Sequence, residues 1–453
     1  MTSIINYSVV TAIYIISALP AYGMSLTEAF NQADRNNPAL LAERARLRAS
    51  DEEVAQVVGQ WRPSLSITAS RGAGREIVTG GTPVEDQNYQ GLVPSDTYGL
   101  TLTETIFSPG RSASKRKALA TAMAEEMHLA SLEQTTFLKI AQDYLDVLRD
   151  QEDLALYAEN ERTTKSELDA GHARLSIGEI NRLDLSQLDA NYHSAIAQRH
   201  AAEAQLTSSQ QSFERDAGSE LSASEYPNPA SLIDKGRAEA SDSDANPDVL
   251  AALYTAKASE AAIEATEAQD LPVISLHGGV THEDDAAFQN SRTNVLSVSI
   301  QLSWSLYQGG ILESQARAAK EALIASRFDI STARRAAQSQ MTTSRANIQA
   351  GKSSIAALTV AATANQLALE GTKHQQQAGE RTVLDVLNAQ HALLQSKQTL
   401  EHAIHDEMYA EFSLAASVGK LTSTALGLEN TELRNNLYLR RITGKWFGFE
   451  PVD

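Results

Sequence analysis

The segment Gly178-Glu-Ile-Asn-Arg-Leu-Asp184 returns 201 residues later as Gly379-Glu-Arg-Thr-Val-Leu-Asp385. Each copy lies between two long stretches that contain no proline and almost no glycine. We expect these stretches to form helices at about 112–177 and 182–217, and again at about 311–378 and 382–418. Glycine just after a helix C-terminus is a common end signal, so each copy predicts a turn between two helices. At 1.5 Å per residue the first helix of each pair would be about 100 Å long, and each pair would form a hairpin of coiled-coil character.

The repetition extends over most of the chain. Asn37-Pro38 recurs as Asn246-Pro247, and Phe107-Ser-Pro-Gly110 is matched by Tyr307-Gln-Gly-Gly310. Solenoid repeats have roughly 20–50 residues, and this unit of about 200 residues is far longer. The sequence therefore predicts two equivalent structural repeats and a C-terminal tail, at 24–220, 221–420 and 421–453.

Four short segments alternate apolar side chains with serine and threonine, as strands with one apolar face do. Leu65, Ile67 and Ala69 show this pattern in the first repeat, and Val298 and Ile300 show it in the second. The expected strands lie at about 62–72, 97–107, 271–281 and 293–305. A Gly- and Pro-rich loop at about 71–96 joins the first pair, and a shorter loop at about 282–292 joins the second.

These segments have the length and the alternation of strands that cross an outer membrane. Aromatic side chains that favour a membrane interface lie at or near their ends, namely Trp61, Tyr98, Phe107, Trp304 and Tyr307. The strands of a soluble sheet would alternate equally well, but that sheet would need a helix across its apolar face, and the sequence supplies none at that point. Four strands are too few for a closed barrel, and open strand edges are not tolerated in lipid. If the strands enter a membrane, several chains must therefore share one barrel.

The N-terminus predicts export, and the composition excludes several kinds of site. Residues 1–23 have the pattern of a signal peptide, with an apolar run at 9–19 and a small-x-small end at Ala21-Tyr-Gly23. A short membrane anchor is the alternative for this segment, although the run is too short to span a bilayer as a helix. The absence of cysteine excludes disulfides, thiolate metal sites and cysteine nucleophiles. The net charge of −19 argues against nucleic acid as a partner.

Several motifs resemble the TolC family of outer-membrane channels, and they occur in that family's order. They are Ser25-Leu-Thr-Glu-Ala29, Arg62-Pro-Ser-Leu-Ser66, Leu306-Tyr-Gln-Gly-Gly310 and, most strongly, the segment from Gly379 to Gln390. The likeness covers about 25–421. In addition, Gly444-Lys-Trp446 resembles the tail of the family's protein-secretion members.

The resemblance implies a homotrimer in the cell outer membrane, in contact with its lipid. The fold would be mainly α with a β-barrel portion: each chain gives four strands to a 12-stranded barrel and two helical hairpins to a periplasmic tunnel. The implied function is the exit duct of a tripartite efflux or type I secretion system. Its partners would be a periplasmic adaptor protein and an inner-membrane transporter, either ABC or proton-driven, whose docking opens the periplasmic tip. Such a duct is not an enzyme, and we expect no cofactor, metal or catalytic residue.

The resemblance also assigns roles at the tip. Asp385 matches the family's aspartate at the closed periplasmic end, where three copies around one axis would attract cations. Asn388 stands where the family often has a second aspartate, so we expect a weaker cation preference. Arg381 matches the family's latch arginine and Asp184 matches its aspartate partner, whereas the latch tyrosine falls on Gln376.

The residues themselves leave alternatives open. Thr382-x-x-Asp385 and Asn181-x-x-Asp184 each fit a capping box, in which a carboxylate is favoured without any gating role. For the whole chain, the rival interpretation is a soluble periplasmic structural coiled-coil protein without a pore. An enzyme is a third interpretation, which no convergent set of residues supports.

Two further sets of residues have no expected role in the barrel, the tunnel or the gate. His402 and His405, three residues apart on a predicted helix beside acidic residues, could hold a metal, but we expect them on a solvated helix surface. The end of the tail contains Trp446, Phe447 and Phe449 and is apolar enough to dock against another surface.

Overall fold

The computed structural model describes residues 24–74, 93–221, 226–227, 243–284, 292–428 and 437–449. The expected signal segment at 1–23 and the middle of both strand-connecting loops lie outside these residues. The chain divides into two compact units. The hairpin unit comprises 1–33, 137–232 and 347–410, and the sheet unit comprises 34–136, 233–346 and 411–453.

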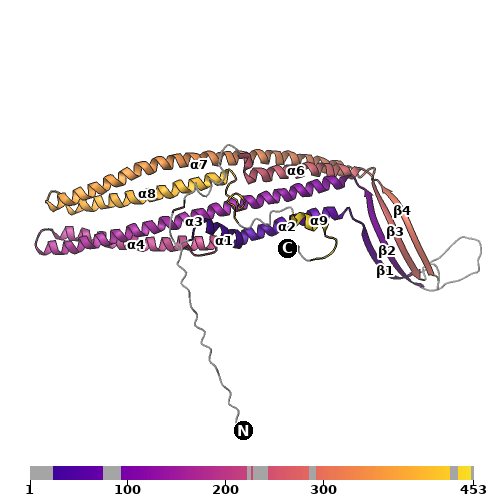
Figure 1. Cartoon of the computed structure of the whole chain (residues 1–453), viewed down its shortest axis with the longest axis horizontal. Coiled ribbons are helices and arrows are strands. Elements are labelled where there is room, and N and C mark those ends of the chain that lie inside the picture. The colour runs from indigo at the N-terminus through magenta and orange to yellow at the C-terminus, as the bar shows by residue number, and fades with distance from the viewer. Residues whose placement is uncertain are drawn as a thin grey trace, which may run out of the picture. The chain divides into compact units, whose positions relative to one another are not determined.

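The sheet unit contains a four-stranded antiparallel sheet, whose strands lie side by side in Figure 1. The strands are β1 (Ser64–Gly74), β2 (Val93–Phe107), β3 (Val273–Asp284) and β4 (Arg292–Ser303). Their order in the sheet is β1-β2-β3-β4, so the β2–β3 pairing joins the two halves of the chain. Within the described residues, β1 and β4 are the two edges of the sheet.

A proline directly precedes the first strand of each half of the chain. β1 starts directly after Pro63 and β3 directly after Pro272, two residues later than expected. Proline has no N–H and cannot donate to a ladder, so regular pairing begins after it. At the other end β1 continues to Gly74, which pairs with Val93 of β2. The ladder therefore includes residues that their Gly and Pro content had assigned to the loop.

One face of the sheet is apolar across all four strands. The pairs Leu65↔Leu102, Leu102↔Gly278 and Gly278↔Val298 place these residues on a common face. Glu104 and His282 are polar exceptions on it, and the end of this face next to the loops is polar, with Arg71, Asp96, Asp284, Arg292 and Asn294. The opposite face carries mainly serine and threonine. The described residues leave the apolar face uncovered, with Ile67 81% and Leu296 79% exposed.

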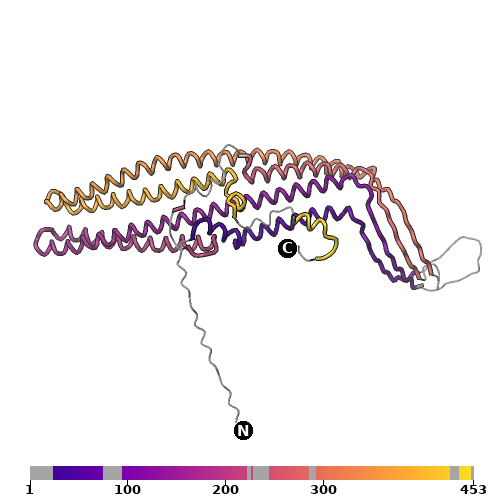
Figure 2. Tube along the Cα trace, in the orientation of Figure 1, coloured from indigo at the N-terminus to yellow at the C-terminus, as the bar shows by residue number. Residues whose placement is uncertain are grey.

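Two helical hairpins contain the four longest helices of the described chain, and Figure 2 traces them as paired tubes. They consist of α3 (Gly110–Ser176) with α4 (Arg182–Ala217), and α7 (Ile311–Gln377) with α8 (Val383–Ser417). Both turns use a glycine with positive φ, +77° at Gly178 and +78° at Gly379. The next residue then donates its N–H to a carbonyl five residues back, at 2.9 Å in both turns. This is the Schellman arrangement, which satisfies carbonyls left free at a helix end.

Shorter helices connect these elements. They are α1 (Leu26–Asn36), α2 (Pro38–Gly59), η1 (Ser243–Ala245), α6 (Pro247–Glu267), η2 (Ala268–Asp270) and α9 (Leu437–Gly444). Asn37 and Asn246 cap α2 and α6 alike, each accepting a 2.9 Å hydrogen bond from the backbone N–H two residues on. A proline follows at the first helical position, where its missing N–H costs nothing.

Aromatic side chains form the core where α1, α3 and α4 meet in the hairpin unit. The rings of Phe30 and Phe137 lie 5.2 Å apart, and those of Tyr144 and Phe213 lie 6.0 Å apart. All four side chains are buried. None of the helices in the described part of the chain is long and apolar enough to cross a membrane.

Candidate functional site

The two hairpin tips carry the residues that the sequence singled out, and both tips are built by capping. At the start of α8, the Asp385 carboxylate accepts hydrogen bonds from the N–H and the hydroxyl of Thr382, each at 2.9 Å. At the start of α4, the Asp184 carboxylate accepts from the Asn181 N–H at 3.3 Å, and Asn181 accepts from the Asp184 N–H at 2.9 Å. The predicted capping roles are confirmed, whereas a gating role for Asp385 stays a prediction.

The charge of Asp385 is stabilised by its surroundings. The backbone and side-chain hydrogen bonds from Thr382 lower the pKa of Asp385, and the nearby Arg381 lowers it further. Nη1 of Arg381 lies 4.0 Å from Oδ1 of Asp385. Hydrogen bonds to the ionised form favour that form, so Asp385 is a carboxylate at neutral pH.

Arg381 contacts its own hairpin. Its Nε donates to Oε1 of Gln375 at 3.2 Å, in addition to its approach to Asp385. Among the described residues of this chain, no ion pair joins Arg381 to Asp184. The Asp184–Arg381 latch therefore stays a prediction, and its formation needs the tips to approach each other differently from the arrangement in a single chain.

The first turns of α8 have one buried and one uncovered side. The buried side comprises Val383, Val386, Leu387 and Gln390. Val383 and Leu387 pack with Leu168 of α3 and Leu188 of α4. Asn388 is exposed and Asp385 is half-exposed, three residues apart on the other side. The two predicted constriction residues thus lie on the side of α8 that the described part of the chain leaves uncovered.

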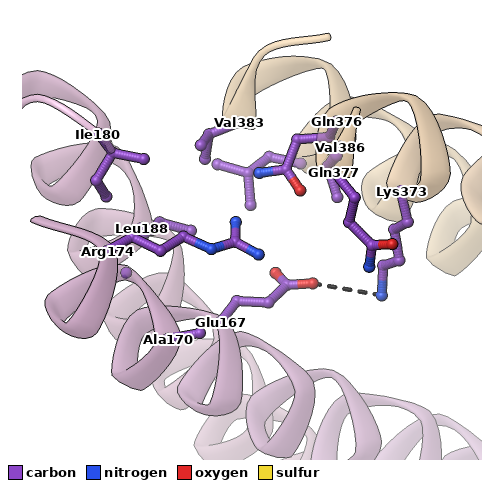
Figure 3. A pocket seen from close by; sticks show the side chains of 12 residues that line it. Glu167, Ala170, Arg174, Ile180, Leu188, Lys373, Gln376, Gln377, Val383 and Val386 are labelled. Atoms are coloured by element: carbon purple, nitrogen blue, oxygen red, sulfur yellow. Dashed lines mark ion pairs between the residues drawn. The ribbon is translucent and has the colours of Figure 1, made fainter. Parts of the chain in front are cut away.

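A cavity of about 190 Å³ lies between the two hairpins, just behind their turns. Residues of α3 and α4 line one side, and residues of α7 and α8 line the other (Figure 3). Its polar lining consists of Glu167, Arg174, Lys373, Gln376 and Gln377. Gln376 therefore lies on the cavity between the hairpins, at the position that the resemblance gives to a latch tyrosine.

Glu167 links the hairpins across this cavity. Its Oε1 lies 3.4 Å from Nζ of Lys373 and accepts a 2.7 Å hydrogen bond from Nε2 of Gln390. Burial raises the pKa of Glu167, and the opposing effects of Lys373 and Gln390 only partly offset it. A partly buried carboxylate thus joins α3 to both helices of the second hairpin.

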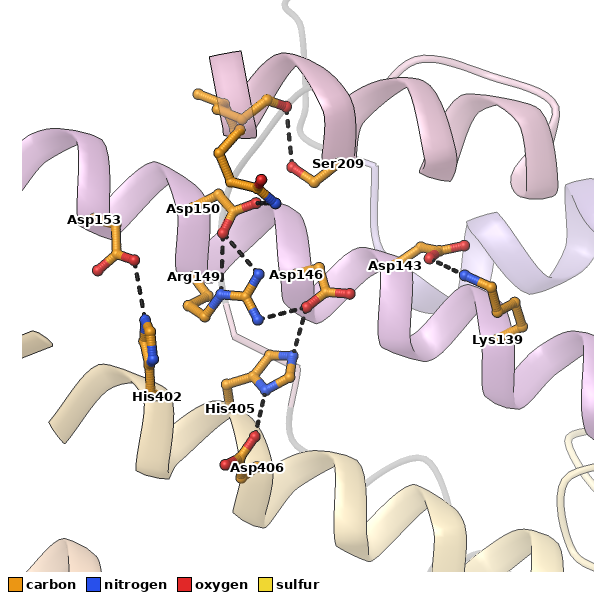
Figure 4. Close-up of polar contacts among 12 residues, drawn as sticks. Lys139, Asp143, Asp146, Arg149, Asp150, Asp153, Ser209, His402, His405 and Asp406 are labelled. Atoms are coloured by element: carbon orange, nitrogen blue, oxygen red, sulfur yellow. Dashed lines mark hydrogen bonds and ion pairs between the residues drawn. The ribbon is translucent and has the colours of Figure 1, made fainter. Parts of the chain in front are cut away.

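A second polar link lies further along the same helices (Figure 4). Nε2 of His405 lies 3.1 Å from Oδ1 of Asp146, and its Nδ1 lies 3.0 Å from Oδ1 of Asp406. His402 lies 3.0 Å from Asp153 in the same way. The expectation of a solvated surface is wrong for His405, which is 6% exposed because α8 packs against α3 here. Within the described residues no group of side chains has the composition of a metal site.

This second link is strongly charged. Burial lowers the pKa of His405, but the Asp146 and Asp406 carboxylates outweigh burial, so the pKa is raised. Burial raises the pKa of Asp146, but His405 and Arg149 outweigh burial, so the pKa is lowered. Both partners are therefore favoured in their charged forms. At Asp143, one turn before Asp146 on α3, burial dominates and raises the pKa to about 6.

Comparison with known proteins places this geometry in a family. Residues 29–219 and 243–420 match the family described as outer membrane efflux protein. The chain belongs to the outer membrane efflux protein family. The resemblance inferred from the motifs is thereby confirmed.

Individual members of the outer membrane efflux protein family align along nearly the whole chain. The outer membrane efflux protein BepC of Brucella suis is 28% identical over 446 residues, covering 97% of this chain and 95% of BepC. The outer membrane protein TolC of Vibrio cholerae is 24% identical over 417 residues, covering 88% of this chain and 91% of TolC. A crystal structure of CusC superposes with a TM-score of 0.77 at 18% identity, covering 87% of this chain and 91% of that one.

Membership of the outer membrane efflux protein family places the chain in the outer membrane, with its helices in the periplasm. The strand ends next to the helices form one end of the sheet. Four of the predicted interfacial aromatics lie at or beside these ends: Trp61, Phe107, Trp304 and Tyr307. Tyr98 differs, because it pairs with Ala69 and His282 toward the loop end of the sheet. All five aromatic side chains are exposed in the single chain.

The links between the two hairpins were missed by sequence reasoning. Gln390 follows the buried Val386 by four residues, and Lys373 follows the buried Leu369 by four. A polar residue at such a spacing signals an unusual core position. Its partner Glu167 lies more than 200 residues away in the sequence, so the spacing could reveal the anomaly but not the contact.

Proposed function

We propose that this outer membrane efflux protein is an exit duct of three copies that serves a tripartite efflux or type I secretion system. The observation that carries the proposal is a sheet with two edges and one apolar face to which no other described residue of the chain adds a strand or a cover. A sheet of this kind is incomplete in the single chain. It needs further strands along both edges and an apolar environment over one face.

Three copies in a bilayer would meet both needs. Unpaired backbone N–H and C=O groups cost several kcal/mol each in lipid, so spanning sheets close on themselves. The smallest single-chain barrels have about eight strands, twice the number available here. If β4 of each copy pairs with β1 of the next, three copies give a closed barrel of 12 strands. The apolar face then contacts lipid and the Ser/Thr face lines the lumen.

The hairpin tips would provide the gate. Three copies of Asp385 around one axis would form a ring of carboxylates, which attracts cations and resists anions. Asn388 beside it adds no charge, so one ring would determine selectivity. The Glu167–Lys373–Gln390 contacts hold the hairpins of one chain together behind these tips. An Asp184–Arg381 latch would contribute about 1 kcal/mol or less per pair, so several must break together for opening.

The partners follow from the direction of transport. A duct that crosses only the outer membrane has no energy source of its own. We propose that a periplasmic adaptor protein and an inner-membrane transporter supply cargo and, by docking at the tips, separate the latch residues. The chain itself then requires no catalytic residue or cofactor.

The proposal is tested by a pair of substitutions on the two faces of β1. Ile67→Arg places a charge on the apolar face and should cost about 2–4 kcal/mol near the bilayer midplane. Thr68→Arg places the same charge on the opposite face and should cost little, because that face would meet water in the lumen. We expect Ile67→Arg to abolish heat-modifiable trimers in the outer-membrane fraction and conductance in planar bilayers, while Thr68→Arg retains both.

The rival structural protein predicts a different pattern. A soluble coiled-coil protein would be recovered from the periplasm, would form no pore, and would respond alike to the two charges. Equal behaviour of Ile67→Arg and Thr68→Arg, with no conductance from the unsubstituted protein, would therefore reject the duct.

A further inference from the structure

The segment that follows α9 is fixed beside the start of β1. Nη1 of Arg62 donates to the carbonyl of Lys445 at 2.6 Å, and Nη2 donates to the carbonyl of Thr443 at 2.5 Å. The guanidinium also lies over the ring of Trp446, 4.7 Å from its centroid. Arg62 directly precedes Pro63, after which β1 begins. One side chain thus contacts a carbonyl in the last turn of α9, the carbonyl of the residue that follows α9, and the first aromatic residue after it.

A second set of contacts fixes α9 itself. Ile442 is buried, and the Tyr438 hydroxyl donates to Oε1 of Glu52 on α2 at 3.4 Å. Ile442, Tyr438 and Glu52 lie within the sheet unit, and so do Arg62 and its partners. The position of the segment relative to β1 is therefore set at two separate points.

This fixed segment exposes its aromatic side chains. Trp446 is 61% exposed and Phe447 is 89% exposed, and Phe449 is exposed as well. Three exposed aromatic residues within four positions are unusual for a surface in water, where large apolar patches mark contact sites. The described part of α9 and of this segment, 437–449, also carries Arg440, Arg441 and Lys445 and no acidic residue.

We propose that Lys445–Phe449 is a membrane-interface anchor that inserts its aromatic rings among the phospholipid headgroups of the periplasmic leaflet. This inference rests on the proposed function, in which the strands cross the outer membrane. The segment, held by Arg62, then lies at the periplasmic end of β1, where Trp61 precedes Arg62 in the sequence and the apolar face begins at Leu65. Tryptophan and other aromatic rings favour this depth, and basic side chains beside them are attracted to lipid phosphates.

The composition of the segment fits an anionic lipid surface as its contact. Residues 437–449 contain three basic residues and no acidic one, and two acidic residues, Glu450 and Asp453, follow them in the sequence. Aromatic rings joined to basic residues are the composition of segments that lie at an anionic membrane surface. Arg62, which holds the segment, lies two residues before β1, and the apolar face of β1 faces lipid in the proposed trimer.

Tryptophan fluorescence tests the anchor, because the chain has only three tryptophans. Trp61→Phe with Trp304→Phe leaves Trp446 as the single reporter, and Trp61→Phe with Trp446→Phe leaves Trp304. Each protein is reconstituted in vesicles of phosphatidylcholine and phosphatidylglycerol with bromine on the acyl chains, either near the headgroup or near the chain end. We expect Trp446 emission to be quenched most by bromine near the headgroup, as strongly as that of Trp304.

The outcomes separate the anchor from the duct. If Trp304 is quenched but Trp446 is not, the duct stands and the anchor is overturned, with a contact to a neighbouring chain as the remaining explanation. If neither is quenched, the strands are not in the bilayer and both proposals fail. Arg62→Ala in the Trp446 protein should reduce the quenching, because the segment loses its fixed position. Arg71→Ala, which removes an exposed arginine at the other end of β1, is the matched control and should leave the quenching unchanged.

Discussion

At the residue scale, the charge of Asp385 can be separated from its capping role. Asp385→Asn keeps an oxygen that can accept from Thr382, so the start of α8 should be retained while each chain loses one formal charge, three in the proposed trimer. We expect the reversal potential in a KCl gradient across a planar bilayer to move toward zero. Asn388→Asp adds three charges one helical turn further on and should increase cation selectivity instead.

Asp184→Asn serves as the matched control for this prediction. It alters the same kind of capping box at the start of α4, outside the proposed constriction. Selectivity should therefore remain that of the unsubstituted channel. If Asp385→Asn and Asp184→Asn have the same effect, helix capping rather than a ring of charge determines the selectivity.

The proposed latch depends on one interaction, between Asp184 and Arg381. Asp184→Ala and Arg381→Ala should each increase the fraction of time that the channel is open. Because both remove one shared interaction, the double substitution should have nearly the effect of either alone. Asp189→Ala combined with Arg381→Ala is the control, since Asp189 is an exposed residue of α4 that lies near His193. If the effects of Asp184→Ala and Arg381→Ala on the open time are strictly additive in single-channel records, the proposed latch is wrong.

The sequence predicted the tip residues where the physical cause is local. Asn181 and Thr382 stand three residues before an aspartate, and that spacing is sufficient to specify a capping box. The contacts of Arg381 with Gln375 and Asp385 depend on how the turn folds back, which spacing does not specify. Burial of His405 likewise depends on the packing of α8 against α3, whose residues lie about 250 positions earlier.

At the scale of elements, the helices could be predicted more closely than the strands. The absence of proline and the positive-φ glycines define the helical hairpins through local backbone chemistry. Strand ends are determined by pairing: β1 reaches Gly74 only because β2 begins at Val93 opposite it. The composition of that region suggests a loop, and only the neighbouring strand makes it part of the ladder.

The contact between α3 and α8 predicts a pH dependence of stability. The pKa of His405 is raised in the folded chain, so its ion pairs with Asp146 and Asp406 stabilise fully below about pH 6.5, the ordinary pKa of histidine. This contribution is lost as the pH rises through the raised pKa. Asp143 also makes the folded chain less stable as the pH rises, but over a lower pH range. Its pKa is raised from 3.8 to about 6, so it becomes a partly buried carboxylate between these values.

His405→Gln isolates the histidine. Glutamine can still donate to Asp146 but does not titrate. The fall in unfolding temperature above about pH 6.5 should therefore become smaller, while the fall at lower pH that Asp143 causes should remain. Circular dichroism melts of the detergent-solubilised protein over this range would measure the effect. His391→Gln is the control on the same helix, at an exposed site where Nε2 lies 3.0 Å from Asn191. An unchanged pH profile in His405→Gln would show that the link carries no protonation-dependent stability.

At the scale of the whole molecule, the duct depends on pairing between β4 of one chain and β1 of the next. The chain has no cysteine, so any disulfide that forms must come from the introduced cysteine pair. Ser66→Cys on β1 is combined in turn with Ser297→Cys, Ser299→Cys and Gln301→Cys on β4, which samples the unknown register along one face. Mild oxidation in membranes should link chains into covalent dimers and trimers for the pair whose Cα atoms come within about 6 Å.

A second pair shows whether a strand contact within one chain reacts under the same conditions. Thr103 of β2 and His277 of β3 are direct partners in the ladder, so Thr103→Cys with His277→Cys should close within a single chain and give no covalent oligomer. If this pair oxidises and none of the β1–β4 pairs links chains, the edges are not joined in the membrane. A barrel shared by several chains would then be excluded, because its closure has no other edges among the described strands.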